Sequence, residues 1–425
     1  MFETKPTTVP ITKEMVREAY RKVKANKGSA GIDKESLEEF QSYLLNNLYK
    51  LCNRLSSGSY FPKPVREVSI PKANGSKRTL GIPTVSDRIA QQVIKAYLEP
   101  RLEAEFSNNS YGYRPLKSAH QAVEAVRKNV RDYAWVVDMD IKSFFDEVNH
   151  ELLMKALNCH VEEKWTMLYI KRWLEVPSQS QDGTLTTKEG EGTPQGGVIS
   201  PLLANLYLHY VLDKWLEKYY PHVAFVRYAD DVILHCRNED EAKQTLEAVR
   251  QRLQECKLRL NEEKTKIVYC QDYRRKRRKD YKKKFDFLGF TFKPQEQISK
   301  HGGTFLGYGC EISQNAQRRI VEGWKKQNFH LQSTLTIQEI ATEINPQMIG
   351  IIRYYGKYRK WALQKLMRRF HYRLAKWVLK KYKGLKGSFP KAYEWINEIK
   401  VSYPTMFYHW TIFNSIGWYD KSRMK

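Results

Sequence analysis

The segment from Val223 to Cys236 places the strongest constraint on how this chain can fold. Two runs rich in β-branched and aromatic residues flank a short polar centre that contains the adjacent aspartates Asp230 and Asp231. This pattern predicts a β-hairpin with both aspartates at or beside its turn. Adjacent carboxylates in an apolar setting repel each other, so a hydrated turn or a divalent cation must compensate their charge. The dipeptide alone fits either explanation, because aspartate is also common in ordinary turns.

A second pair of aspartates, Asp138 and Asp140, lies in the β-rich run 134–141. Residues i and i+2 of a strand share a face, so at least one of these carboxylates can meet the aspartates of the hairpin. The order strand, helix, strand-turn-strand, helix predicts an α+β domain with helices on one face of a sheet and both aspartate strands central. Taken alone, the run also fits a plain strand capped by Asp140, with Phe144 and Phe145 in the core.

The composition indicates a polyanionic partner. Lys and Arg number 73 against 47 Asp and Glu, which gives a formal net charge of +26 and a pI of about 9.6. Nucleic acid is the leading candidate and an acidic membrane surface the weaker one. The six cysteines include no C-x-x-C pair, so neither a zinc site nor a disulfide framework is indicated. Without an apolar leader or an unbroken membrane-spanning run, the sequence predicts a cytoplasmic protein with no membrane partner.

An N-terminal hairpin carries two candidate phosphate-binding cations. Alternating residues over 65–72 and 77–82, separated by turn residues, predict the hairpin, with Lys72 and Arg78 near its tip. These cations could clamp a triphosphate, or they could only protect an exposed edge strand from aggregation. A helix over 36–55 is expected to precede the hairpin.

A sharp turn is predicted at Thr193–Gly197, where a proline and two glycines follow one another closely. In such a turn the backbone can approach a flat ligand closely. A long apolar helix is expected to follow over Val198–Lys218.

A run of single-sign charge covers residues 271–284, with nine basic residues against two acidic ones. Such runs are usually solvated loops, but the interleaved tyrosines make this one a candidate contact for a phosphate backbone. The residues singled out in it are Arg274, Arg275, Arg277 and Arg278.

The C-terminal part is predicted to be helical after a glycine-rich boundary at 295–309. Residues 353–386 hold thirteen Lys or Arg and no Asp or Glu. An apolar stripe in this segment has helical spacing and is expected to be core, and consists of Leu363, Leu366, Phe370, Leu374 and Trp377. The basic residues outside the stripe are the candidate RNA or DNA surface, and include Arg368, Arg369, Lys376 and Lys380.

Together these motifs resemble a reverse transcriptase, most closely the proteins encoded by bacterial group II introns. The resemblance rests first on Tyr228-Ala229-Asp230-Asp231, which is similar to the catalytic box, and on Asp140 followed five positions later by Phe145. It continues through a nucleotide-pocket motif at 193–205, later palm motifs at 260–265 and 287–290, fingers motifs at 27–33, 70–83 and 110–115, and a thumb and maturase region from 345 onward. An ordered series of boxes is far more specific than any one box.

The resemblance implies a right-hand polymerase of α+β class, with fingers and palm built on antiparallel sheet and a helical thumb/maturase domain. The implied domains are 1–125 for the N-terminal extension and fingers, 126–295 for the palm, and 296–425 for the thumb and maturase region. The implied partners are an RNA template or intron RNA, a DNA primer or target DNA, and deoxynucleoside triphosphates.

The resemblance also implies the chemistry. Two Mg²⁺ ions would be held by Asp140, Asp230 and Asp231 with the backbone carbonyl of Ile141. The implied substrate-binding residues are Lys72 and Arg78 at the triphosphate, Gln195 in the nucleotide pocket, Lys264 of a palm motif, and Phe145 under the sugar, where it would exclude a 2′ hydroxyl. Asp138 could replace Asp140 by register, but the spacing to Phe145 favours Asp140.

Two other interpretations stay open from the sequence. The protein could be an RNA-binding splicing cofactor with secondary polymerase activity, or a free-standing reverse transcriptase used in defence or repair. The sequence leaves no room after Trp410 for a DNA endonuclease domain, and no His/Asn/Cys cluster suggests one, so endonuclease-driven target cleavage is not expected.

Overall fold

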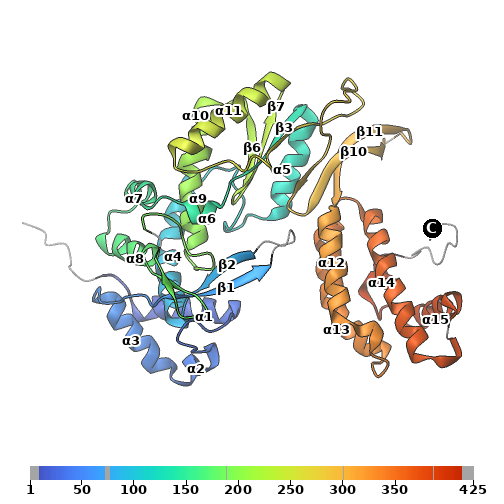
Figure 1. Cartoon of the computed structure of the whole chain (residues 1–425), viewed down its shortest axis with the longest axis horizontal. Coiled ribbons are helices and arrows are strands. Elements are labelled where there is room, and N and C mark those ends of the chain that lie inside the picture. The colour runs from blue at the N-terminus through green and yellow to red at the C-terminus, as the bar shows by residue number, and fades with distance from the viewer. Residues whose placement is uncertain (1–8, 72–76, 188, 300, 386, 414–425) are drawn as a thin grey trace, which may run out of the picture. The chain divides into compact units, whose positions relative to one another are not determined.

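The computed structural model describes residues 9–71, 77–187, 189–299, 301–385 and 387–413 (Figure 1). The chain forms two compact units, Met1–Ile267 and Val268–Lys425. Over the described residues, no helix is both long and apolar enough to cross a bilayer.

Three short helices open the first unit, namely α1 (Lys13–Asn26), α2 (Leu37–Ser42) and α3 (Leu44–Ser56). The Thr12 hydroxyl caps α1 by accepting a hydrogen bond from the Met15 amide. The prediction of one continuous helix over 36–55 was wrong, because Tyr43 leaves the helical conformation. The Asn47 side-chain amide donates to the Phe40 carbonyl at 3.1 Å and so satisfies a group that the break releases.

The predicted N-terminal hairpin belongs to a sheet with the strand order β2-β1-β4-β5. Its strands are β1 (Val65–Pro71), β2 (Lys77–Ile82), β4 (Ser178–Gln179) and β5 (Leu185–Thr186). β1 and β2 pair antiparallel, whereas β1 and β4 pair parallel. The long helix α4 (Val85–Glu105) follows directly and is buried along most of its first half.

A second sheet, with the strand order β6-β7-β3-β8, carries the aspartate segments. Its strands are β3 (Trp135–Asp140), β6 (Ala224–Tyr228), β7 (Asp231–Cys236) and β8 (Lys266–Tyr269), the last of which runs from the first unit into the second. Helices α5 (Ala119–Asp132) and α11 (Glu239–Glu255) contact this sheet. The two aspartate strands, β3 and β7, are central in the sheet, as predicted.

The remaining helices of the first unit connect these sheets. They are α6 (Phe144–Glu147), α7 (His150–Asn158), α8 (Lys164–Leu174), α9 (Ser200–Leu208) and α10 (Lys214–Tyr219). The helix expected over Val198–Lys218 begins later and is interrupted by a π-helical turn, His209–Asp213. The Gln91 side-chain oxygen accepts a hydrogen bond from the Val198 amide at 2.7 Å, which satisfies that donor just before α9 starts.

The second unit begins with a three-stranded antiparallel sheet in the order β11-β10-β9. Its strands are β9 (Phe285–Phe287), β10 (Phe290–Ile298) and β11 (Thr304–Ile312). The glycine-rich stretch 295–309, predicted to separate two domains, therefore forms part of a hairpin. A Cβ atom at Gly307 would lie 2.5 Å from the side chain of Gln297, so this glycine allows close contact across the strands.

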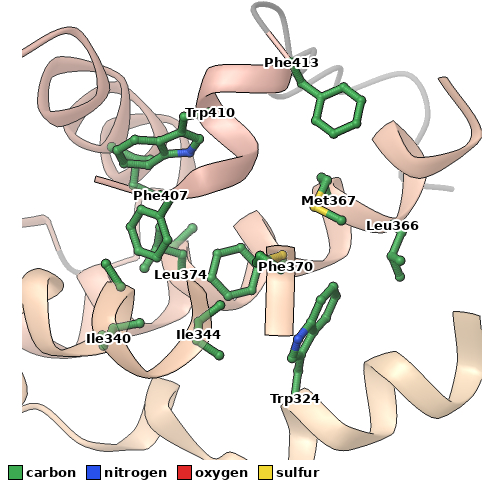
Figure 2. Packing of buried hydrophobic residues seen from close by; sticks show 14 of the residues in the cluster. Trp324, Ile340, Ile344, Leu366, Met367, Phe370, Leu374, Phe407, Trp410 and Phe413 are labelled. Atoms are coloured by element: carbon green, nitrogen blue, oxygen red, sulfur yellow. The ribbon is translucent and has the colours of Figure 1, made fainter. Parts of the chain in front are cut away.

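Helices predominate in the described residues after β11, as predicted. They are α12 (Gln314–Gln327), α13 (Ile337–Tyr355), α14 (Lys360–Lys381), α15 (Phe389–Ser402) and α16 (Tyr408–Ile412). Figure 2 shows their shared core, in which Phe370 packs among aromatic rings that include Trp324 and Phe407. All five residues of the predicted stripe in α14 are buried in this core.

Candidate active site

The predicted aspartate hairpin is formed by β6 and β7. Tyr228 pairs with Asp231 across the hairpin, which leaves Ala229 and Asp230 as the two residues of the turn. Ala229 has a φ of 57° and so occupies the left-handed region. A side chain in this region is uncommon and raises the energy of the backbone, so the surrounding structure must stabilise the turn.

The neighbouring strand brings a third carboxylate to the hairpin. The antiparallel register between β3 and β7 places Asp140 directly opposite Asp231. Side chains that face each other in this way have Cβ atoms about 5 Å apart. Asp138 shares the face of Asp140 but pairs with Lys266, whose ammonium group lies 3.1 Å from its carboxylate. The register thus makes Asp140 the β3 aspartate opposite Asp231.

A loop before β8 fixes the Asp140 carboxylate. The Oδ2 atom of Asp140 accepts hydrogen bonds from the side chains of Asn261 and Lys264, both at 3.0 Å. The Asn261 amide also donates to the Asp140 carbonyl at 2.8 Å. Sequence reasoning assigned no role to Asn261, although it lies in the motif at 260–265 that was singled out. The structure places it and Lys264 against the first predicted catalytic residue.

Negative charge is concentrated at this end of the sheet. Although Asp231 is an exposed residue, the protein around its carboxyl displaces water, and this effect, followed by the negative charges of Asp230 and Asp140, raises its pKa to about 7. Within the described ranges, no group of three or more His, Cys, Asp or Glu side chains is arranged as a ready metal-binding cluster. The donor set nevertheless suits a hard divalent cation, because it consists of carboxylate oxygens, which are the ligands that such ions prefer.

A cleft of about 760 Å³ opens beside these carboxylates. Asp140 and Asp230 line it, whereas Asp231 does not belong to its lining. The predicted substrate-binding residues Ile141, Phe145, Gln195 and Lys264 also line it, so residues far apart in the sequence meet here. The cleft has the size of a small-molecule binding site.

The predicted sharp turn forms one wall of this cleft. Gly196 has a φ of 122°, and a Cβ atom there would lie 2.6 Å from the Gly81 carbonyl oxygen of β2. The Gly81 amide in turn donates to the Gln195 carbonyl at 2.8 Å. Phe145 is tied to the same turn, because its carbonyl accepts a hydrogen bond from the Thr193 amide at 2.8 Å. Glycine is therefore required here by a close backbone approach.

The two predicted triphosphate cations are placed only in part. Lys72 lies outside the described residues. The backbone of Arg78 lies in β2 opposite Ile70, whereas the Arg78 side chain is not among the described parts of the structure.

The predicted nucleic-acid residues of the second unit are mostly exposed. On α14, the side chains of Arg368, Arg369, Lys376 and Lys380 all reach solvent. In the run 271–284, Arg277 and Arg278 are exposed, but Arg274 pairs with the buried Asp272 at 2.8 Å, and Arg275 lies 3.9 Å from the same carboxylate. The basic run is therefore partly neutralised, whereas the α14 surface is not flanked by acidic residues of its own helix.

Comparison with known families gives two matches. Residues 70–292 match the family described as "Reverse transcriptase (RNA-dependent DNA polymerase)". Residues 317–394 match the family described as "Group II intron, maturase-specific domain".

Individual relatives agree with these matches. The chain is 35% identical over 304 residues to "Protein YkfC" of Escherichia coli (strain K12), which covers 61% of this chain and 78% of that protein. It is 35% identical over 201 residues to "Group II intron-encoded protein LtrA" of Lactococcus lactis subsp. cremoris, covering 47% of this chain and 33% of LtrA. The "Putative COX1/OXI3 intron 1 protein" of Saccharomyces cerevisiae is 32% identical over 208 residues, covering 48% of this chain and 24% of that protein.

The α+β fold and the ordered motifs agree with these findings, and the first family match spans more than half of the 425 residues. The chain belongs to the group II intron-encoded reverse transcriptase and maturase family, and its polymerase domain is an RNA-directed DNA polymerase.

Proposed function

We propose that this chain adds deoxynucleotides to a primer 3′ end on an RNA template, and that Asp140, Asp230 and Asp231 hold the two Mg²⁺ ions of the reaction. One observation carries the proposal. Three carboxylates from β3, β7 and the connecting turn gather at one end of a sheet, beside a nucleotide-sized cleft. When bound, the ions would lower the pKa of the primer 3′ hydroxyl and neutralise negative charge on the leaving pyrophosphate.

The residues of the chain orient the reactants around this site. Asn261 and Lys264 hold the Asp140 carboxylate, so its oxygens are fixed before substrate arrives. The Ile141 carbonyl follows directly in the chain and is the proposed fourth metal ligand. Lys264 already lies in the cleft, where its ammonium group can contact the substrate triphosphate, together with Lys72 and Arg78 of the N-terminal hairpin.

Two cleft residues are proposed to select the nucleotide. Gln195 lines the pocket beside the sharp turn, and its side-chain amide lies 3.4 Å from Asp146. Phe145 is half-buried, its carbonyl is bound by the Thr193 amide, and its ring contacts the Phe144 ring edge to face at a centroid distance of 5.3 Å. A fixed ring at the sugar would exclude a 2′ hydroxyl by steric overlap.

The site assignment is tested by Asp230→Asn, with Asp240→Asn as the matched control. Asp240 is an exposed residue in the first turn of α11, so its replacement changes the net charge equally without touching the site. We expect Asp230→Asn to abolish primer extension on an RNA template and to leave RNA affinity close to wild type, because it removes a metal ligand and no basic residue. Primer extension at the wild-type rate by Asp230→Asn would refute the assignment.

A second role is favoured by the exposed basic surface of α14. We infer that this surface, defined as Arg368, Arg369, Lys376 and Lys380, binds the phosphate backbone of intron RNA and assists splicing and mobility. The maturase-domain match covers all of α14, which supports this assignment. Splicing of the cognate intron transcript in vitro, with and without the protein, tests the role separately from polymerisation.

A further inference from the structure

A buried ion pair lies directly behind the catalytic turn. Arg227 occupies β6, two residues before Ala229, and its side chain is completely buried. Its Nε atom donates to Asp213 Oδ1 at 2.7 Å and its Nη2 atom to Asp213 Oδ2 at 2.5 Å. Asp213 is also fully buried and ends the π-helical turn between α9 and α10. A buried charge pair is costly to desolvate, so its position calls for an explanation other than stability alone.

The remaining donor group of Arg227 reaches the turn itself. Its Nη1 atom donates to the Ala229 carbonyl at 3.2 Å and to the side-chain oxygen of Asn205 at 2.9 Å. The Asn205 amide group then donates to the Gly112 carbonyl at 2.7 Å. One chain of hydrogen bonds therefore joins Asp213, Arg227, Asn205 and Gly112 to the backbone of the turn.

Gly112 packs against the other side of the turn. A Cβ atom at this position would overlap the backbone nitrogen of Ala229 and would lie 3.0 Å from the Tyr228 carbonyl carbon. The segment that carries Gly112 pairs with β6, because the Arg227 amide donates to the Asn109 carbonyl at 2.9 Å and the Tyr111 amide donates to the Arg227 carbonyl at 2.8 Å. Only glycine permits this approach.

The turn needs such support because Ala229 adopts a left-handed backbone. Backbone strain of this kind persists where the surrounding structure fixes it, and it is found at functional sites. We propose that Arg227, Asp213, Asn205 and Gly112 are positioning residues that hold the Ala229–Asp230 turn, and thereby set Asp230 and Asp231 against Asp140. This inference rests on the proposed function, since it assigns a role relative to the catalytic carboxylates.

The first test is Gly112→Ala, which places a methyl group against the backbone of Ala229 without changing any charge. We expect kcat for primer extension to fall by about tenfold to a hundredfold, because misplacing reacting groups by about 1 Å has effects of that size. The dissociation constant for template and primer should be unchanged. Hydrogen exchange at the amides of 228–231 should become faster, which reports on the turn independently of activity.

The matched control is Gly31→Ala. A Cβ atom at Gly31 would lie 2.6 Å from the Thr84 Cα atom, so the steric conflict is with backbone, as at Gly112. Thr84 belongs to the start of α4, where its side chain caps the helix by hydrogen bonds with Asp87. We expect Gly31→Ala to lower thermal stability without changing hydrogen exchange at 228–231.

A second variant, Arg227→Lys, keeps the positive charge beside Asp213. Lysine lacks the planar fork, so it cannot bind Asp213, Asn205 and Ala229 at once. We expect the same fall in kcat and faster exchange at the turn. In the unmodified protein, the amides of Tyr228 and Asp231, which flank the turn and pair across the hairpin, should be protected from exchange as strongly as those of β3, a measurement that needs no variant to fold.

The outcomes separate this inference from the proposed function. If the wild type extends primers, and either variant that folds by circular dichroism keeps the wild-type kcat and turn exchange, the positioning role is refuted and the function stands. Rapid exchange of the Tyr228 and Asp231 amides in the unmodified protein also refutes the positioning role. If the wild type does not extend primers, or Asp230→Asn does not affect extension, the proposed function fails and the inference fails with it.

Discussion

Replacing the four cations of the α14 surface by glutamine should make RNA binding less sensitive to salt. The apolar stripe of α14 is buried whereas the four cations are exposed, so the four substitutions should leave the core intact. With 3.6 residues per turn, Arg369, Lys376 and Lys380 project within about 40° of one another, and Arg368 projects about 100° away. Three of the cations can therefore face one RNA segment together.

The magnitude follows from the number of contacts. Each lost phosphate contact makes the slope of log affinity against log salt shallower by roughly 0.7 to 0.9, so four contacts change it by about 3. Between 50 and 200 mM salt, a slope change of about 3 corresponds to a factor of roughly 60. The wild type should thus lose about 60-fold more affinity than the variant across this range.

Fluorescence anisotropy of labelled template RNA at several salt concentrations measures these slopes. The matched control replaces four surface cations that already pair with acidic neighbours, namely Arg21, Lys171, Lys243 and Arg250, by glutamine. The control changes the net charge equally and should have a slope nearer to that of the wild type. If the α14 variant retains the wild-type slope with an unchanged circular dichroism spectrum, this surface does not contact RNA phosphates.

Three further predictions concern selectivity and stability. Phe145→Ala should let ribonucleotides in, and an unchanged ratio of deoxynucleotide to ribonucleotide incorporation would place the steric block elsewhere. Phe370→Ala should lower the free energy of unfolding of the second unit by about 3 to 5 kcal/mol in urea titrations, because it opens a cavity among packed rings; a loss under 1 kcal/mol would contradict this packing. Burial lowers the pKa of His371 to about 3. Below pH 6.5 this imidazole is therefore protonated in the unfolded chain but neutral in the folded chain, so the free energy of unfolding falls as the pH falls. His371→Leu should remove about 1.4 kcal/mol of this loss per pH unit between pH 6.5 and 5, and equal pH dependence in both proteins would refute the assignment.

Local pattern accounts for what was predictable from sequence. The aspartate hairpin, the strand that carries Asp140 and the buried stripe of α14 all depend on residue periodicity and turn chemistry, which act over a few residues. The glycine-rich stretch 295–309, predicted as a domain boundary, lies in the hairpin of β10 and β11, and glycine serves both boundaries and close strand contacts. The pattern alone does not distinguish the two.

The ends and breaks of these helices involve side-chain hydrogen bonds that do not follow the i to i+4 pattern of a helix. The predicted helix at 36–55 breaks where the Asn47 side chain satisfies the Phe40 carbonyl, and just before α9 the Val198 amide donates to Gln91, about a hundred residues earlier. Helical periodicity contains no information about such hydrogen bonds.

The sequence by itself determined the types of chemical group at the site. These are paired carboxylates, clustered cations and a glycine-containing turn that a flat ligand can approach closely. Only the tertiary structure decided which of them meet. The register of β3 against β7 sets Asp140 opposite Asp231, and Asn261 and Lys264 reach Asp140 from more than a hundred residues away. Arg227 offered no distinguishing pattern, because its role depends on long-range contacts with Asp213 and Asn205 that form only when the sheet and α9 pack together.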